Sequence, residues 1–348
     1  MDQTSCATGV LYENDEVDGK LACPSKKDKA TIKNNCKIRL VWRNILGLIA
    51  LHLGGLLGLY LAIASAKIAT NLFAIFLFLA TAIATTAGPH RLWSHRSYKA
   101  KWPLRLLLVI LQSAAFQGHV IHWSRDHRVH HKYSDTNADP HNAKRGYFFA
   151  HVGWLLVRKN NEVKEKGKGI DLSDLYGDPL LRFQKKYYVI LMVLTCFVIP
   201  TVIPVYYWHE NWANALFVTA FLRYICVLHV SFLVNSAAHF HGYKPYDRNI
   251  KPVQNLSVAI LAVGEGWHNY HHTFPWDYKT SELGNYCFNL TNAFIDFFAW
   301  IGWAYDLKTV STEIIKNRVQ RTGDGTHELW GWGDKDITKE DKDATIVT

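Results

Sequence analysis

Two segments far apart in the chain carry histidines with the same spacing, HxxHH. They are HRVHH and HNYHH, and their histidines are His127, His130, His131, His268, His271 and His272. On an α-helix, positions i, i+3 and i+4 fall within a sector of roughly 100°, so each segment should point three imidazoles at one place. Imidazole nitrogen is a ligand for iron, copper, zinc and nickel. The repeated spacing therefore predicts a metal site to which both segments contribute, rather than two solvated helix faces.

Three further histidines stand in short motifs near these segments. HRLWSH contains His90 and His95, and NSAAH contains Asn235 and His239. His90 and His95 are five positions apart and do not share one face of a regular helix, so we expect a helix end or a bend between them. The roles of five other histidines stay open, either as groups around the ligands or as mere neighbours: His119, His122, His141, His229 and His241.

The nine motif histidines are half of the eighteen in the chain. One ion cannot use nine protein ligands, but two ions with four or five ligands each can. A structural zinc site is four-coordinate and closed, typically with cysteine, and neither cysteine nor carboxylate is interleaved with these histidines. The set therefore favours two iron ions that activate O₂ beside an apolar substrate.

Long apolar segments must position these motifs. Four are long enough to cross a bilayer, and they cover about residues 45–65, 72–88, 187–207 and 212–234. Pro200 and Pro204 should kink or end the third span, and Arg223 and His229 in the fourth should face protein rather than lipid. The predicted fold class is an all-α integral membrane protein with four transmembrane helices and a cytosolic helical cap that holds a di-iron centre.

The distribution of Lys and Arg predicts the orientation of the spans. Basic residues flank the start of the first span and the ends of the second and fourth, whereas the two short connections contain only Lys67. Both termini and both histidine-bearing segments, 89–186 and 235–336, should therefore be cytosolic. The net charge of +10 suits contact with anionic lipid, and no nucleic-acid motif is present. Residues 37–336 form the expected domain, between a disordered tail, 1–36, and a polar tail, 337–348.

The motifs in their context resemble the animal membrane acyl-CoA desaturases of the stearoyl-CoA type, in the insect branch. The segments that carry the resemblance are GPHRLWSHRSYKA, RDHRVHHKYSDTNADPHNAKRGYFFAHVGWLL, NSAAH and GEGWHNYHHTFPWDY, within residues 41–336. The resemblance implies a multi-pass enzyme of the endoplasmic reticulum that introduces a double bond into a long-chain fatty acyl-CoA with O₂. It also implies two Fe²⁺ ions and electrons from NADH through cytochrome b5 reductase and cytochrome b5.

The resemblance also assigns residues. It implies that the catalytic iron ligands are His90, His95, His127, His130, His131, His239, His268, His271 and His272. Asn235 would contact one ion through water. The contacts to the coenzyme A headgroup would be Asn44, Arg125, Asp126, Arg158 and Lys159.

Some positions depart from the family pattern. Phe232 stands where the family often has a tryptophan near the thioester, so a hydrogen-bond donor is missing there. The other departures are His122, Gly118 and His241. Gln254 in KPVQ and the Trp267 of GEGWHNYHH resemble moth pheromone-biosynthesis desaturases, including Δ11 and Δ10 types. We expect a Δ9 or Δ11 enzyme. The alternatives are an acyl hydroxylase or acetylenase on the same scaffold, and a histidine-rich membrane metal transporter, whose ligands should lie inside the spans.

Overall fold

The computed structural model describes residues 38–282, 286–331 and 339–343. The predicted tail 1–36 lies outside the described residues, and of 337–348 only helix α17 (Lys339–Asp343) is described. Four helices are long and apolar enough to cross a membrane, which confirms the predicted all-α fold with four candidate spans. Their bounds are Trp42–Ala64, Ile68–Ser94, Pro179–Trp208 and Trp212–Phe240.

The spans are longer than their apolar segments, and several change from α to π geometry along their length. The first is α1 (Trp42–Ala64), and the second joins α2 (Ile68–Thr85) to the π-helix η2 (Thr86–Ser94). The third consists of α8 (Pro179–Met192), η5 (Val193–Val198) and α9 (Ile199–Trp208). The fourth consists of α10 (Trp212–Asn214), η6 (Ala215–Leu222), α11 (Arg223–Asn235) and α12 (Ala237–Phe240).

The two prolines do not end the third span. Pro200 lies in the first turn of α9, directly after the π-helical η5, and Pro204 lies inside α9. A proline leaves carbonyl groups without their helical partners, and local π geometry is one way in which a span accommodates this. Arg223 is buried as predicted, and its guanidinium donates to the carbonyl oxygens of Ala114 and Cys196 at 2.9 and 3.2 Å.

Glycines allow the first and fourth spans to pack closely. α1 lies against η6, and a Cβ added at Gly58 would collide with the carbonyl oxygen of Phe217. A Cβ at Gly54 would collide with the ring of Phe221. Gly54 and Gly58 are one helical turn apart, the small-xxx-small spacing by which membrane helices approach each other.

The remaining elements lie mainly toward one end of the spans. They are α3 (Trp102–Ala115), α4 (Val120–Tyr133), η3 (Ala143–Arg145), η4 (Phe149–Gly153), α5 (Trp154–Leu156), α6 (Asn161–Lys168), α7 (Ser173–Gly177), α13 (Leu256–Leu261), α14 (His268–Thr273), η7 (Tyr286–Phe288), α15 (Leu290–Trp300) and α16 (Thr312–Thr322). The strands among the described residues are β1 (Lys99–Ala100) and β2 (Ala304–Tyr305), which pair antiparallel. α3 is apolar but too short to span, and α4 turns away from it by 83°.

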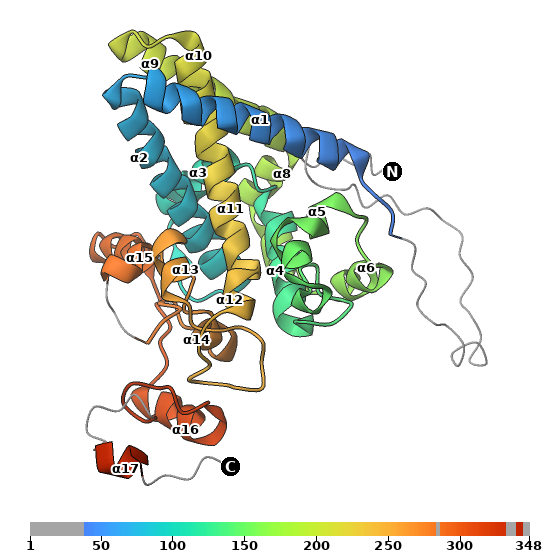
Figure 1. The fold of residues 1–348 in the computed structure, drawn as a ribbon, viewed down its shortest axis with the longest axis vertical. Helices are drawn as coiled ribbons and strands as arrows, with labels where there is room; N and C mark the ends of the chain where they lie inside the picture. Colours follow the sequence, from blue (N-terminus) through green and yellow to red (C-terminus); the bar gives the residue numbers. More distant parts are fainter. Residues whose placement is uncertain (1–37, 283–285, 332–338, 344–348) are drawn as a thin grey trace, which may run out of the picture.

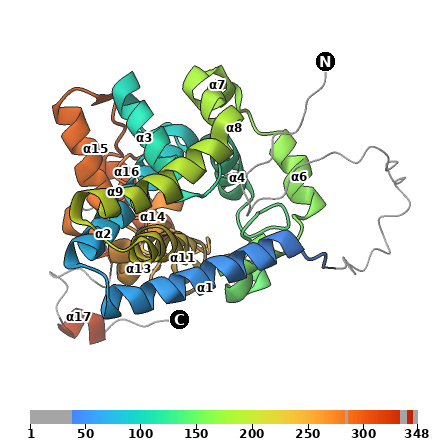
Figure 2. The same cartoon turned by 90° about the horizontal axis from the view of Figure 1, so that it is seen from above.

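This arrangement brings the histidine motifs to one region. α2 and α11 run side by side, and their lower ends in Figure 1 reach the level of α12, α13 and α14. α4 packs against η2, the extension of α2. Figure 2 shows α3 and α15 on the side of the molecule away from α1. The ends of two spans and two short helices thus meet around the candidate site.

Candidate metal centre

All nine motif histidines come together in two adjoining groups. The first group contains five, namely His90, His95, His127, His131 and His271. The second contains four, namely His130, His239, His268 and His272. Within each group the potential ligand nitrogens lie within 4.8 Å of one another. The side chains are buried or half-buried.

The spacing of the nitrogens fits metal ligation. In the first group, Nε2 atoms are 2.8 Å apart for His95 and His127 and 2.9 Å apart for His90 and His271. In the second group, the Nε2 atom of His268 lies 3.1 Å from those of its neighbours His239 and His272. Two ligands at right angles on an ion, with bonds of about 2.1 Å, would be about 3 Å apart. The imidazoles therefore converge at the separation that a shared ion requires.

Each HxxHH segment serves both groups, which corrects the expectation that its three imidazoles point at one place. In α4, His127 and His131 belong to the first group and His130 to the second. In α14 the assignment is exchanged, because His268 and His272 belong to the second group and His271 to the first. Positions i and i+4 are about 40° apart around a helix, whereas i+3 lies at least about 60° from either, so it faces a neighbouring point.

The helix that carries His90 ends between it and His95, which is one of the two expected arrangements, and its last turns are π-helical. η2 continues α2 through His90 to Ser94, and the backbone N–H of His95 donates to the carbonyl oxygen of His90 at 3.2 Å. A π-helix closes its hydrogen bonds between positions five apart, so it brings these two residues onto one side. Their rings lie 5.0 Å apart, edge to face.

Buried carboxylates orient two of the imidazoles, and neither carboxylate was predicted from the sequence. Glu265 accepts from Nδ1 of His90 at 2.9 Å and pairs with Arg91 at 2.8 Å. Asp139 accepts from Nδ1 of His130 at 2.8 Å. Each contact leaves the Nε2 atom of the histidine available to a metal, as is usual for metal-bound histidines. The available signal was proximity in sequence, since Asp139 follows the first HxxHH and Glu265 precedes the second.

These contacts argue against a third metal site. His130, Asp139 and His141 also lie close enough together to hold an ion. However, the Nδ1 atom of His130 is already engaged with Asp139, and its ring lies 5.1 Å from that of His272 in the second group. His141 therefore lies beside the site without being one of the nine converging imidazoles.

Electrostatics favour neutral ligands at most of these positions. Burial, followed by the charges of neighbouring imidazoles, lowers the pKa well below the usual value for His95, His127, His131, His268, His271 and His272. Burial opposes charging of His130 as well, but the Asp139 carboxylate raises its pKa. Burial would raise the pKa of Glu265, but His90 and Arg91 lower it to about 2. Neutral imidazole is the form that binds metal, so the donor set fits metal ions.

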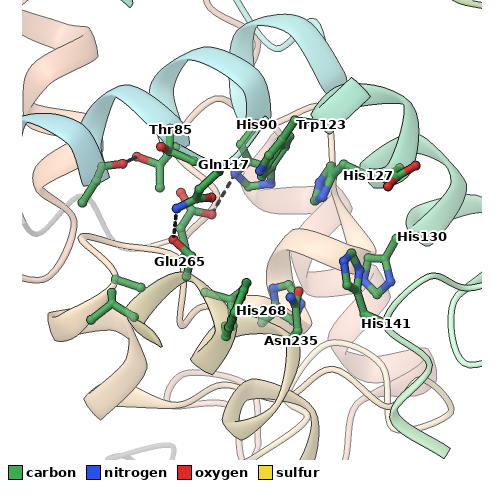
Figure 3. A pocket seen from close by; sticks show the side chains of 18 of the residues that line it. Thr85, His90, Gln117, Trp123, His127, His130, His141, Asn235, Glu265 and His268 are labelled. Carbon is green, nitrogen blue, oxygen red and sulfur yellow. Dashed lines mark hydrogen bonds and ion pairs between the residues drawn. The ribbon is translucent and has the colours of Figure 1, made fainter. Parts of the chain in front are cut away.

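A cavity runs along the two groups, and Figure 3 shows it from close by. It contains about 920 Å³ of space not filled by atoms, including the part open to solvent. Four of the nine motif histidines line its wall, namely His90, His127, His130 and His268. Asn235, at the end of α11, lines the same cavity close to His268. Gln117 donates to the hydroxyl of Ser231 at 2.8 Å, which joins the α3–α4 connection to α11 in the wall.

The two ends of the cavity differ in character. Small, uncharged residues line one end, namely Ala82, Thr85, Thr86, Ala262 and Val263. At the other end Asp126 and His122 line the wall, and Lys159 and Arg125 pair with Asp126 at 2.7 and 3.0 Å. We call these four residues the charged end. Burial would raise the pKa of Asp126, but Lys159, His122 and Arg125 hold it well below its usual value.

The other two candidate headgroup residues occupy different positions. Asn44 is buried and donates to the carbonyl oxygen of Leu155 at 2.8 Å, so it fixes the chain just before the charged end. Arg158 is exposed, and its backbone N–H donates to the carbonyl oxygen of Arg39 at 2.9 Å. Arg125, Asp126 and Lys159 thus lie together. Asn44 does not join them but holds the preceding segment at Leu155, and Arg158 lies at the surface.

Histidines outside the nine have separate environments. His52, His229 and His151 form a hydrogen-bonded series with N···N distances of 2.9 and 3.0 Å, which ties α1, α11 and η4 together. His119 caps the N-terminus of α4 by accepting from the backbone N–H of His122. Two more lie elsewhere: His327 bonds to Glu282, and His209 ends α9.

Residues that depart from the family pattern lie in and around the cavity. Phe232 is buried in the cavity wall, and His122 lies at the charged end. Gly118, with φ of +86°, donates its N–H to the hydroxyl of Tyr188 at 2.9 Å. His241 lies beside Tyr147 near the surface. Gln254 pairs with the backbone of Trp267, directly before α14, and lies outside the cavity wall.

Comparison with known proteins agrees with this geometry. The sequence model of the family described as fatty acid desaturase matches residues 66–284. A protein of Acheta domesticus named acyl-CoA Delta-9 desaturase is 58% identical over 99% of this chain and 97% of its own length. An acyl-CoA Delta(11) desaturase of Spodoptera littoralis is 56% identical over 99% of each chain. The stearoyl-CoA desaturase of Homo sapiens is 52% identical over 88% of this chain and 84% of its own length. The chain therefore belongs to the fatty acid desaturase family, as the resemblance of its histidine motifs predicts.

Proposed function

We propose that this protein is an acyl-CoA desaturase with a di-iron centre, and that it forms a double bond at Δ9 or Δ11 of a long saturated chain. The observation that carries this proposal is the position of the nine imidazoles. They form two adjoining groups along a cavity that has a charged end and an end lined by small, uncharged side chains. An acyl-CoA molecule has the same polarity, with an anionic headgroup and an apolar chain.

The metal would be held by His90, His95, His127, His131 and His271 in one position and by His130, His239, His268 and His272 in the other. Iron bound there would supply the O₂ chemistry needed to remove hydrogen from an unactivated CH₂–CH₂ unit. O₂ takes two hydrogen atoms from the substrate and two electrons from cytochrome b5 and, with two further protons from solvent, leaves as two waters. Relatives named acyl-CoA desaturases support this assignment.

The residues of this chain bind and position the substrate. Lys159 and Arg125 supply positive charge for the headgroup, and Asp126 holds both cations in place. Burial of each methylene contributes about 0.8 kcal/mol, so a long chain binds strongly once it is enclosed. Neighbouring methylenes are chemically alike, so the cavity decides which pair lies beside the histidines.

The alternatives make different demands on the structure. A metal transporter should carry its ligands along the spans, but both histidine groups lie where the ends of two spans meet α4 and α14. A hydroxylase or acetylenase would use the same two groups. Only the product separates these activities from desaturation.

Expression in a yeast that lacks its own desaturase tests the proposal. We expect growth without added unsaturated fatty acid, and mass spectrometry of the product should place the double bond at Δ9 or Δ11. A matched culture with His130→Ala controls for background products. A hydroxylated chain as the main product, or no new unsaturated chain from any saturated substrate, would contradict the proposal.

The chain carries four candidate spans and is a multi-pass membrane protein. We place it in the endoplasmic reticulum with both termini and the histidine groups in the cytosol, where NADH-dependent cytochrome b5 reductase can supply cytochrome b5 with electrons. The support is the charge pattern at the span ends. Glycosylation acceptors inserted at each terminus should stay unmodified, while one inserted between residues 208 and 212 should be modified.

A further inference from the structure

Trp154 lines the cavity and carries an unused hydrogen-bond donor. It begins α5, is 7% exposed and lines the cavity wall. Its Nε1 atom has no hydrogen-bond partner among the residues that the structure describes. The rings around it are those of His141, at 4.4 Å edge to face, and Phe232, at 5.7 Å. Buried donors are nearly always satisfied, so an unpaired one in a cavity wall points to a bound acceptor.

The location of Trp154 restricts what that acceptor can be. Lys159, at the charged end, follows it by five residues, and Leu155, held by Asn44, follows directly. On its other side, the ring of His141 lies 5.6 Å from that of His130, a member of the four-histidine group. Trp154 therefore lies between the place for the headgroup and the place for the reacting carbons.

The thioester carbonyl is the acceptor of an acyl-CoA that lies nearest to the reacting carbons, because the amide carbonyls of the pantetheine arm lie on the headgroup side of it. The chain beyond the thioester is a run of methylenes with no polar atom, and the headgroup stays at the charged end. The thioester carbonyl oxygen joins these two parts. Phe232, the other aromatic residue at this point of the wall, has no donor to offer.

We propose that the Nε1–H of Trp154 donates a hydrogen bond to the thioester carbonyl of the bound acyl-CoA and so fixes the register of the chain. The inference rests on the proposed function, because it requires an acyl-CoA substrate. A single anchored carbonyl sets how many methylenes lie between it and the histidine groups. Trp154 is thus a substrate-positioning residue for the double-bond location.

The test compares two ligands that differ only at this carbonyl. They are palmitoyl-CoA and its thioether analogue, S-hexadecyl-CoA, in which a methylene replaces the C=O. Binding is measured by calorimetry on the iron-loaded enzyme in lipid nanodiscs, without reductant, so that no turnover occurs. The wild-type enzyme should bind the thioester roughly 3- to 10-fold more tightly, the range for one hydrogen bond. In Trp154→Phe this preference should fall below about twofold.

The comparison separates a hydrogen bond from packing. Loss of ring volume alone weakens both ligands equally and leaves their ratio unchanged. Phe232→Leu, which removes an aromatic ring without a donor from the same wall, is the matched control and should keep the wild-type ratio. An unchanged ratio in Trp154→Phe overturns the inference. Equal affinity of both ligands for the wild-type enzyme also overturns it, and this result needs no variant. No binding of either ligand would instead contradict the proposed function.

Discussion

Asp139→Asn should weaken iron binding at the four-histidine group. Asp139 is 3% exposed, and its Oδ1 atom accepts from Nδ1 of His130 at 2.8 Å and from the backbone N–H of His141 at 2.9 Å. Its Oδ2 atom accepts from the backbone N–H of Asp135 at 2.8 Å. The amide can keep the first two contacts through its oxygen. Its nitrogen then faces the N–H of Asp135, so that contact and the negative charge behind His130 are lost.

The size of the effect follows from the role of this carboxylate. Loss of a group that orients a metal-bound histidine typically reduces metal affinity about 10- to 100-fold, which corresponds to about 1.4–2.7 kcal/mol. Because the imidazole keeps an acceptor, we expect the lower half of that range. The five-histidine group does not contact Asp139 and should keep its ion. The variant should therefore lose about one of its two irons to a competing chelator while the other stays bound.

The assay is anaerobic competition between the purified enzyme and a chromogenic Fe²⁺ chelator, with iron counted per chain at each chelator concentration. The matched control is Asp174→Asn, because Asp174 also bonds to a side chain of α4, Arg128, at 2.7 Å but touches none of the nine histidines. Its iron retention should match the wild type. If Asp139→Asn keeps both irons with wild-type affinity, the orienting role of Asp139 is wrong.

The other predictions concern catalysis, headgroup binding and helix packing. His130→Ala should abolish product formation while the protein still inserts into membranes, measured by product analysis and membrane fractionation; near-normal turnover would refute its role as a ligand. Lys159→Met should raise KM for acyl-CoA roughly tenfold with kcat within about twofold, whereas Lys168→Met on exposed α6 should change neither. Gly58→Ala should destabilise by about 1–3 kcal/mol, seen as a lower Tm, because its Cβ meets a backbone carbonyl of η6. Gly177→Ala, where a Cβ meets nothing within 4 Å, should leave Tm unchanged.

The spans could be predicted from hydropathy, but their ends could not. The second apolar segment stops near residue 88, yet the helix continues to Ser94 and includes the fully buried Arg91. Arg91 is stabilised there by Glu265, which is 174 positions away in sequence. Mean hydropathy over a window of residues reflects the free energy of transfer into lipid. The last turns of this helix are buried in protein instead, so their hydropathy does not predict them. α3 was missed for a related reason: its apolar run is too short to span a bilayer.

The nine histidines could be predicted from their spacing, but their partners could not. Helix periodicity relates residues within one element, so it groups His127 with His131. Asp139 contacts His130 from a loop, and Glu265 contacts His90 because segments remote in sequence meet. Helix periodicity predicts neither contact. The same limit applies to Trp154, whose importance follows from an unpaired donor that only the packed structure reveals.

The HxxHH spacing suits a pair of ions better than a single one. Each helix gives positions i and i+4 to one histidine group and position i+3 to the other, and α4 and α14 do so with the groups exchanged. Where the helices meet, His131 and His272 stack at 4.1 Å, one from each group. The angle of about 60° between positions i and i+3 thus separates the two histidine groups. Because α4 and α14 have opposite assignments, each helix contributes histidines to both groups. A segment reduced to HxxxH would keep the pair of one group and lose the imidazole of the other, so the middle histidine of each motif, His130 or His271, links the two histidine groups.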